Sequence, residues 1–183
     1  MAKLHFYYST MNAGKSTLLL QINYNNSEKK IHTILFLPDV ASSDGIITSR
    51  LGLFARAMLL YDNLNLFKYI KSLSVLPKLI LVDEAQFLKK KQVFELIAIV
   101  DILNINIFTY GLRTDFRGKL FDGSKYLLAL SDKIIEIKSI CFCGNKATMT
   151  ARVENAKRQI SGNQIDLSKK KYMSFCRYHY YNI

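Results

Sequence analysis

One stretch near the N-terminus constrains the fold more than any other: Ser9-Thr10-Met11-Asn12-Ala13-Gly14-Lys15-Ser16. Its spacing matches the pattern G-x-x-x-x-G-K-[ST] at every position but the first. In that pattern a strand ends in a loop, and backbone N–H groups of the loop and of the following helix surround a triphosphate. The stretch therefore predicts a phosphate-binding loop, with Lys15 on the β- and γ-phosphates and the Ser16 hydroxyl on Mg²⁺.

The flanking residues support this interpretation. An apolar run at residues 4–8 precedes the loop, and Leu18, Leu19 and Ile22 follow it at helical spacing. Ser9 is the one departure from the pattern, and it would be costly if the position required a backbone angle that only glycine adopts freely. The alternative is an ordinary strand, turn and helix in which the matching residues occur by chance.

A second block supplies the acids that a phosphate-transfer site needs. The apolar residues 79–82 end in Asp83 and Glu84. Acids at the C-terminal end of a parallel strand lie at the crevice where ligands bind in such sheets. We expect Asp83 to hold Mg²⁺ through water and Glu84 to take a proton from a nucleophile, against the alternative of a strand that simply ends in exposed acids.

Apolar periodicity indicates strands that alternate with helices. We expect strands at residues 4–8, 33–37, 78–82, 105–110 and 134–138, and helices at 16–24, 64–73 and 92–103. Residues 40–50 show no periodicity and read as a mobile surface loop, and residues 111–123 as a long loop. This order predicts an α/β fold with a mainly parallel sheet and helices on both faces.

Length and composition limit the class of protein. A chain of 183 residues allows one α/β domain and a small appendage. The formal charge of +12 permits an anionic partner, but the lysines are dispersed, so a nucleic-acid role is not expected. The sequence has neither a leader pattern nor an apolar run of membrane-spanning length, which predicts a cytoplasmic protein without a membrane partner.

The C-terminal residues contain all of the cysteines. Cys141-Phe142-Cys143 and Cys176-Arg177-Tyr178-His179 form two pairs of ligands, and three thiolates with one imidazole suit a closed structural zinc site. The alternative is that the cysteines are reduced and merely buried. We expect a P-loop domain at residues 1–139 and a small β appendage that binds zinc at 140–183.

Four blocks in the same order give the chain a family resemblance. Besides residues 9–16 and the block Asp83-Glu84-Ala85-Gln86-Phe87, they are Tyr110-Gly111-Leu112-Arg113-Thr114-Asp115-Phe116 and Tyr172-Met173-Ser174-Phe175-Cys176-Arg177-Tyr178-His179. Together they resemble the thymidine kinases of the cellular, zinc-containing type over residues 3–180. Ser9 also matches a bacterial branch of that family.

The resemblance implies an enzyme that uses ATP to phosphorylate the 5′-hydroxyl of thymidine in DNA-precursor salvage. It implies a RecA-like domain, a zinc-bearing appendage with a lid over the nucleoside, and a homotetramer. By the same analogy Glu84 is the base, and Asp83 and Gln86 line the nucleotide and metal site. The residues implied to surround the nucleoside are Met11, Leu112, Phe116, Phe121, Thr150 and Tyr172.

The chain also departs from the family pattern. The family carries an acid and an arginine in the loop after the second strand, which is shortened here, so Asp39 or Asp44 could replace the acid and Arg50 or Arg113 could be the arginine. Asp166-Leu167-Ser168 stands where the family has a glycine pair, so the lid would follow a different path. We expect loss of zinc to disrupt nucleoside binding and to leave ATP binding nearly intact.

Two alternatives remain open from the sequence. One is a P-loop NTPase that acts on nucleic acid, which only the positive charge supports. The other is a deoxynucleoside kinase of relaxed specificity that accepts deoxyuridine as well as thymidine.

Overall fold

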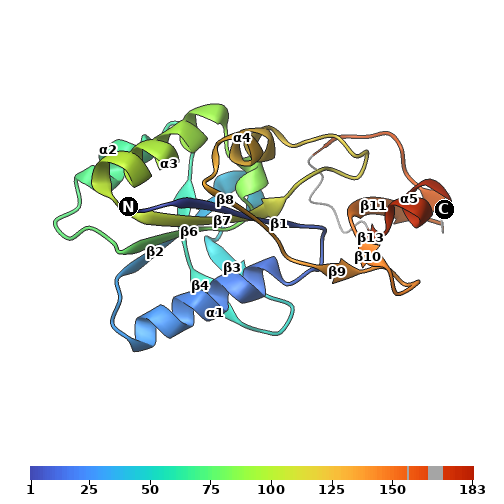
Figure 1. The fold of residues 1–183 in the computed structure, drawn as a ribbon, viewed down its shortest axis with the longest axis horizontal. Helices are drawn as coiled ribbons and strands as arrows, with labels where there is room; N and C mark the ends of the chain where they lie inside the picture. The colour runs from blue at the N-terminus through green and yellow to red at the C-terminus, as the bar shows by residue number, and fades with distance from the viewer. Residues whose placement is uncertain (156, 165–170) are drawn as a thin grey trace.

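The structure is a computed structural model that describes residues 1–155, 157–164 and 171–183. Its centre is a six-stranded sheet in the order β5-β2-β6-β7-β1-β8 (Figure 1), and each neighbouring pair is parallel. The strands are β1 (Leu4–Ser9), β2 (Thr33–Pro38), β5 (Met58–Leu60), β6 (Leu79–Val82), β7 (Asn106–Leu112) and β8 (Lys133–Glu136). The expected parallel sheet is confirmed.

Helices cover both faces of this sheet (Figure 1). They are α1 (Lys15–Glu28) on one face, and α2 (Leu66–Lys71), α3 (Lys90–Leu103) and α4 (Asp122–Leu130) on the other. Because successive side chains of a strand point to opposite faces of the sheet, β6 contributes side chains to the cores on both faces. Ile80 and Val82 belong to the core beneath α3, whereas Leu79 and Leu81 pack in the core beneath α1. The uninterrupted apolar run of β6 is thus explained by burial on both faces.

The prediction of a surface loop at residues 40–50 is wrong in part. A short 3₁₀ turn, η1 (Asp39–Ala41), leads to β3 (Ile46–Thr48), which pairs antiparallel with β4 (Phe54–Arg56). Ile47 is only 2% exposed and joins the core beneath α1. Burial of Ile47 and the packing of Ala55 against the same core hold the hairpin against the domain, although the Ser, Asp and Gly residues before Ile47 are typical of a loop.

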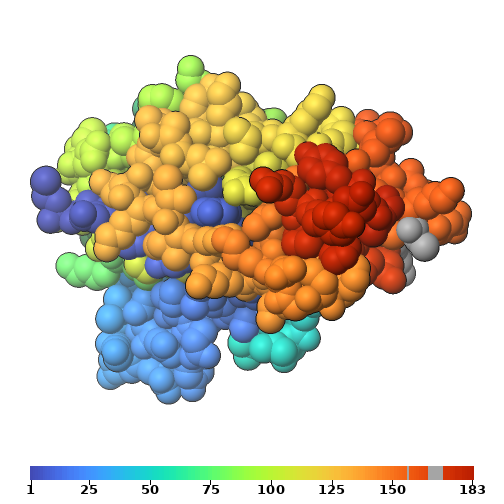
Figure 2. Space-filling view, turned by 45° about the vertical axis from the view of Figure 1, so that its right-hand side comes forward, coloured from blue at the N-terminus to red at the C-terminus, as the bar shows by residue number. Residues whose placement is uncertain are grey.

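The C-terminal residues form short strands beside the main sheet. They are β9 (Ser139–Ile140), β10 (Lys146–Ala147), β11 (Met149–Glu154), β12 (Lys157–Arg158) and β13 (Lys171–Phe175), followed by the helix α5 (Arg177–Tyr181). β11 lies between β12 and β13, antiparallel to both. A small core of Cys141, Ala147, Ala151, Phe175, Cys176 and Tyr180 holds them together. In Figure 2 the C-terminal strands and α5, coloured orange to red, form a lobe at one end of the molecule.

Asp166, Leu167 and Ser168, which replace the family's glycine pair, lie outside the described residues. Across the part of the chain that the structure describes, none of the helices has the length and apolar character required to cross a bilayer.

Candidate phosphate, nucleoside and metal sites

The phosphate loop follows β1 and leads directly into α1. Asn12 and Gly14 have φ angles of 62° and 87°, in the left-handed region, which asparagine and glycine tolerate best. Left-handed residues within a turn direct successive N–H groups to one side, and such a concavity binds anions. Ser9 ends β1 with a negative φ, so serine at this position carries no backbone strain.

Lys15 lies buried at the start of α1, and its Nζ donates to the Thr10 carbonyl at 3.2 Å. Burial lowers the pKa of Lys15, and the carboxylates of Glu84 and Asp83 oppose that shift. The lysine is therefore held at the floor of the loop, facing the two acids that follow β6. This placement brings together the charged residues of both predicted motifs.

Asp83 is buried at the end of β6, and the nearby Ser16 hydroxyl acts to lower the pKa of its carboxyl group, against larger effects that raise it. The backbone N–H of Glu84 donates to Asp83 Oδ1, at 3.0 Å. Burial and then the Glu84 carboxylate raise the pKa of Asp83. A bound cation would offset both effects, so the pair of Ser16 and Asp83 fits the hard oxygen ligands that Mg²⁺ prefers.

Glu84 occupies a left-handed turn, with φ 49° and ψ 36°, at the start of η2 (Ala85–Phe87). Gln86 Nε2 donates to Glu84 Oε2, and Gln86 Oε1 accepts from the backbone N–H of Leu112 at 3.0 Å. The side chain of Gln86 thus links the carboxylate of Glu84 to the end of β7. A non-glycine residue in this region of backbone space is uncommon, and such residues concentrate at functional sites.

Two glycines allow close packing around η2. A Cβ on Gly123 would lie 2.6 Å from the Ala85 carbonyl oxygen and 2.8 Å from that of Gln86, and one on Gly111 would lie 2.9 Å from Gln86 Oε1. Both sites lack room for any side chain. The turn that carries Glu84 is therefore held tightly between β7 and α4.

Two cavities meet at Glu84. The first is lined by Met11, Asn12, Ala13, Gly14, Lys15, Ser16, Thr17, Leu18, Gln21, Thr48, Ser49, Arg50, Leu51, Glu84 and Leu112, and we call it the phosphate cavity. The second is lined by Met11, Ala41, Glu84, Gln86, Phe87, Leu112, Thr114, Asp115, Phe116, Phe121, Thr150, Gln164 and Tyr172, and we call it the nucleoside cavity. Met11, Glu84 and Leu112 belong to both.

The nucleoside cavity contains all six residues that the family resemblance assigned to the nucleoside. Gln86 also lines the nucleoside cavity. It does not line the phosphate cavity, although the resemblance assigned it to the nucleotide and metal site. Ser9, Thr10 and Asp83 are buried and belong to the lining of neither cavity. The predicted residues therefore divide between a first group at the phosphate loop and a second in the adjacent cavity.

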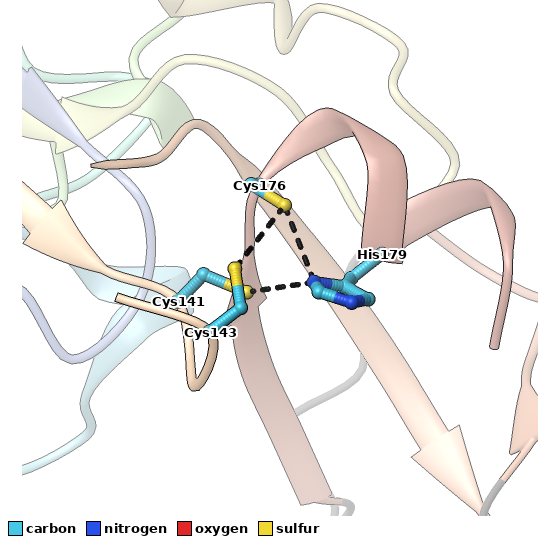
Figure 3. Close-up of side chains that lie close together, drawn as sticks. All are labelled: Cys141, Cys143, Cys176 and His179. Atoms are coloured by element: carbon cyan, nitrogen blue, oxygen red, sulfur yellow. Dashed lines mark hydrogen bonds between the residues drawn. The ribbon is translucent and has the colours of Figure 1, made fainter. Parts of the chain in front are cut away.

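The third site is the cluster of Cys141, Cys143, Cys176 and His179 (Figure 3), whose ligand atoms all lie within 4.8 Å of one another. Cys143 Sγ is 3.9 Å from Cys176 Sγ, and His179 Nδ1 is 3.5 Å from Cys141 Sγ and 3.4 Å from Cys176 Sγ. Sulfur and nitrogen ligands arranged tetrahedrally about zinc at 2.0–2.3 Å would be roughly 3.4–3.8 Å apart. The cluster is thus compatible with zinc.

The thiols of this cluster are poised differently. Burial raises the pKa of Cys141, but hydrogen bonds from the backbone N–H groups of Cys143 and Cys176 and from the side chains of His179 and Cys143 together outweigh it and lower the pKa to about 6. For Cys176, a hydrogen bond from the backbone N–H of His179 lowers the pKa, while burial and the two other thiols give a net rise. One thiolate therefore disfavours the next, and a cation at the centre would remove this conflict.

Comparison with known proteins decides the family. The family model described as thymidine kinase matches residues 2–180, nearly the whole chain. The chain belongs to the thymidine kinase family. It is 50% identical to the thymidine kinase of Zymomonas mobilis, over 98% of this chain and 96% of that protein. It is 47% identical to the thymidine kinases of Escherichia coli K12 and Salmonella typhimurium, over 98% of this chain and 91% of each.

Membership of the thymidine kinase family confirms the resemblance drawn from four motifs. It disfavours the alternative of a P-loop protein that acts on nucleic acid, because the match extends through both cavities and the cysteine cluster. It also implies ATP as the phosphate donor.

The two candidate arginines and the two candidate acids occupy different surroundings. Arg50 lines the phosphate cavity. Arg113 donates from Nη2 to the Thr148 carbonyl at 3.1 Å and lies over the ring of Tyr8, outside both cavities. Asp39 accepts from the N–H of Val40, and Asp44 from Ser42 and Ile46, and neither acid lines a cavity. Of these four candidates, the structure brings only Arg50 to the phosphate loop.

Sequence reasoning missed several residues of the nucleoside cavity. Phe87 and Thr114 lie within the quoted blocks, but the resemblance assigned them no role in nucleoside binding. Asp115 lies within a quoted block, but nothing marked its carboxylate as buried. Gln164 had no signal, because its place in the cavity depends on contacts with residues more than forty positions earlier.

Proposed function

We propose that this protein transfers the γ-phosphoryl group of ATP to the 5′-hydroxyl of thymidine. The observation that carries the proposal is that Glu84 lies on the boundary between the phosphate cavity and the nucleoside cavity. A carboxylate at that boundary can accept a proton from a hydroxyl on one side while the hydroxyl oxygen attacks phosphorus on the other. The family assignment supports both substrates.

On the donor side, N–H groups of the loop and the Lys15 ammonium bind the phosphates, and Arg50 is the candidate for further charge neutralisation. Ser16 and Asp83 would hold Mg²⁺, which supplies additional neutralisation when bound. The phosphoryl group passes through a loose transition state, so positioning and charge stabilisation carry most of the acceleration. Every one of these roles falls to a residue at or directly behind the wall of the phosphate cavity.

On the acceptor side, Glu84 is the base. The O5′–P bond forms as the bond from phosphorus to the bridging oxygen of ADP breaks, and the hydroxyl proton passes to the carboxylate. Gln86 orients that carboxylate, because its amide donates to Oε2. Phe116, Phe121 and Tyr172 supply the aromatic walls against which a nucleoside base can pack.

Replacing Lys15 by alanine tests the donor side. Removal of its charge-assisted contacts to phosphate should lower kcat/KM for ATP by about tenfold to a hundredfold, whatever nucleoside is offered. A radiolabelled phosphoryl-transfer assay measures this effect, with Lys29→Ala at the exposed C-terminal end of α1 as the control. An unchanged rate in the Lys15 variant at low ATP would show that the loop is not the phosphate cradle.

The proposal extends to the remaining expectations. Cys141, Cys143, Cys176 and His179 would bind a structural zinc ion, residues 1–139 would be the catalytic domain, and residues 140–183 the zinc-bearing part. The enzyme would act in the cytoplasm. Whether deoxyuridine is also accepted depends on how the nucleoside cavity treats the 5-methyl group, which a competition assay with both nucleosides would measure.

We also propose a homotetramer. α3 buries its Val93, Leu96 and Ile99 side against the sheet, but Phe94 and Ile102 are 48% and 66% exposed on the same helix. Large apolar side chains that remain exposed are candidates for contacts between subunits. Sedimentation velocity should give four times the chain mass of 21.1 kDa, and a monomer at micromolar concentration would contradict the proposal.

A further inference from the structure

The buried carboxylate of Asp115 connects two segments that both line the nucleoside cavity: the loop after β7 and the residues at Gln164. Asp115, in the loop after β7, is 2% exposed. Its Oδ1 accepts from the backbone N–H groups of Arg117 and Lys119, each at 2.9 Å. Its Oδ2 accepts from Arg117 Nε at 3.0 Å and Nη2 at 2.8 Å. These bonds offset the cost of burying the charge and fix the shape of the loop.

The same carboxylate reaches the segment between β12 and β13. Gln164 Nε2 donates to Asp115 Oδ2 at 3.2 Å and to the Leu120 carbonyl at 3.3 Å, so one amide group is tied to both ends of the loop after β7. Gln164 also lines the nucleoside cavity. This pair of hydrogen bonds therefore fixes the side chain of Gln164 in the cavity wall.

The two residues before Gln164 are tied in the same way, through backbone carbonyls. Arg117 Nη1 donates to the Gly162 carbonyl at 3.2 Å, and Arg152 Nη2 donates to the Asn163 carbonyl at 3.1 Å. Arg152 is buried, with its guanidinium 3.8 Å from the centroid of the Phe116 ring, and it also donates to the Tyr172 hydroxyl. Three successive residues, 162–164, are therefore each held by a side chain that is anchored elsewhere.

We propose that Gln164 is a positioning residue for the nucleoside, which it serves by tying residues 162–164 to the buried carboxylate of Asp115. This inference rests on the proposed function, because it assigns the nucleoside to the cavity that Gln164 lines. A segment held in its binding conformation before the ligand arrives loses less conformational entropy on binding. The tie therefore favours nucleoside affinity, and it makes no contact with the phosphate cavity.

Two variants of Gln164 separate this role from a general effect on folding. Gln164→Met keeps the length of the side chain but removes both donors, and should raise the thymidine KM about tenfold. Gln164→Glu places a carboxylate against Asp115 and the Leu120 carbonyl, and should raise the KM further. In both variants kcat and the ATP KM should stay within twofold of wild type. The thermal unfolding midpoint should stay within a few degrees of wild type.

Gln159→Glu is the matched control, since it makes the same change from amide to acid on the same segment, outside residues 162–164 and outside both cavities. Its thymidine KM should stay within twofold of wild type.

Calorimetric titration with thymidine alone completes the test. Wild-type protein that neither binds nor phosphorylates thymidine would refute the proposed function. If the wild-type protein is active but the Gln164 variants keep the wild-type thymidine KM, the inference about Gln164 alone would be overturned. The same holds if these variants raise the ATP KM as much as the thymidine KM.

Discussion

Replacing Glu84 by glutamine should lower kcat by roughly two to four orders of magnitude, which is the usual contribution of a positioned acid or base. The substitution keeps the size of the side chain and an oxygen that can accept from Gln86 Nε2, so the turn at η2 should persist. What disappears is the ability to accept a proton at the boundary of the two cavities. Because the phosphate-binding groups are untouched, the ATP affinity should change little.

Single-turnover phosphoryl transfer measures this effect free of product release. Glu28→Gln, at the exposed C-terminal end of α1, makes the same chemical change far from both cavities and should leave kcat unaltered. If the Glu84 variant turned over within a few-fold of wild type, another group or water would have to accept the proton. A fall in ATP affinity of similar size would instead point to damage at the phosphate loop.

The parts of this fold that the sequence predicts are those fixed by local pattern. The phosphate loop is specified by residue types at fixed spacing, and β6 by four apolar residues before two acids. The Cys and His pairs are likewise adjacent in sequence, so each half of the cluster is visible without knowledge of the fold. Only the meeting of the halves, at 3.4–3.9 Å, required the structure.

The parts that the sequence does not predict depend on pairing between distant segments. β3 and β5 have three residues each, too few to display a period, and they are strands only because β4 and β2 lie beside them. Arg113 is a cation within one of the motif blocks, but its hydrogen bond to the Thr148 carbonyl holds it outside the phosphate cavity. The tie between Asp115 and Gln164 spans 49 positions of sequence, so no local pattern could indicate it.

The structure also changes the expected consequence of losing zinc. From sequence, ATP binding should survive, because the α/β core has an apolar sheet of its own and should persist without zinc. Yet the backbone of Met11, within the phosphate loop, is held by the C-terminal strands. Its N–H donates to Thr150 Oγ1 at 3.1 Å, and its carbonyl accepts from Ser174 Oγ at 2.5 Å. Ser174 lies two residues before Cys176, so a short stretch of chain connects the cysteine and histidine cluster to the phosphate loop.

Removal of zinc, by a strong chelator or by His179→Asn, should therefore weaken the binding of both substrates, and that of thymidine more than that of ATP. Structural zinc contributes about 10–16 kcal/mol in small zinc-binding peptides, more than the small core of Phe175 and its neighbours can replace. Thymidine binding should fall below detection, since Thr150, Gln164 and Tyr172 all lie in the affected part. ATP affinity should fall by about five- to thirtyfold, the equivalent of losing one or both of these hydrogen bonds at ~1 kcal/mol each.

Calorimetric titrations of metal-free protein with each ligand measure these losses, and far-ultraviolet circular dichroism should show that the parallel sheet persists. His32→Asn, in the turn before β2, is the matched control for His179→Asn and should retain zinc and both affinities. Ser174→Ala isolates the link to Met11, because it should keep zinc and weaken ATP binding severalfold. Unchanged thymidine affinity without metal would mean that the small core alone orders β11 and β13. Unchanged ATP affinity in both the His179 and Ser174 variants would show that the loop holds its shape without these hydrogen bonds.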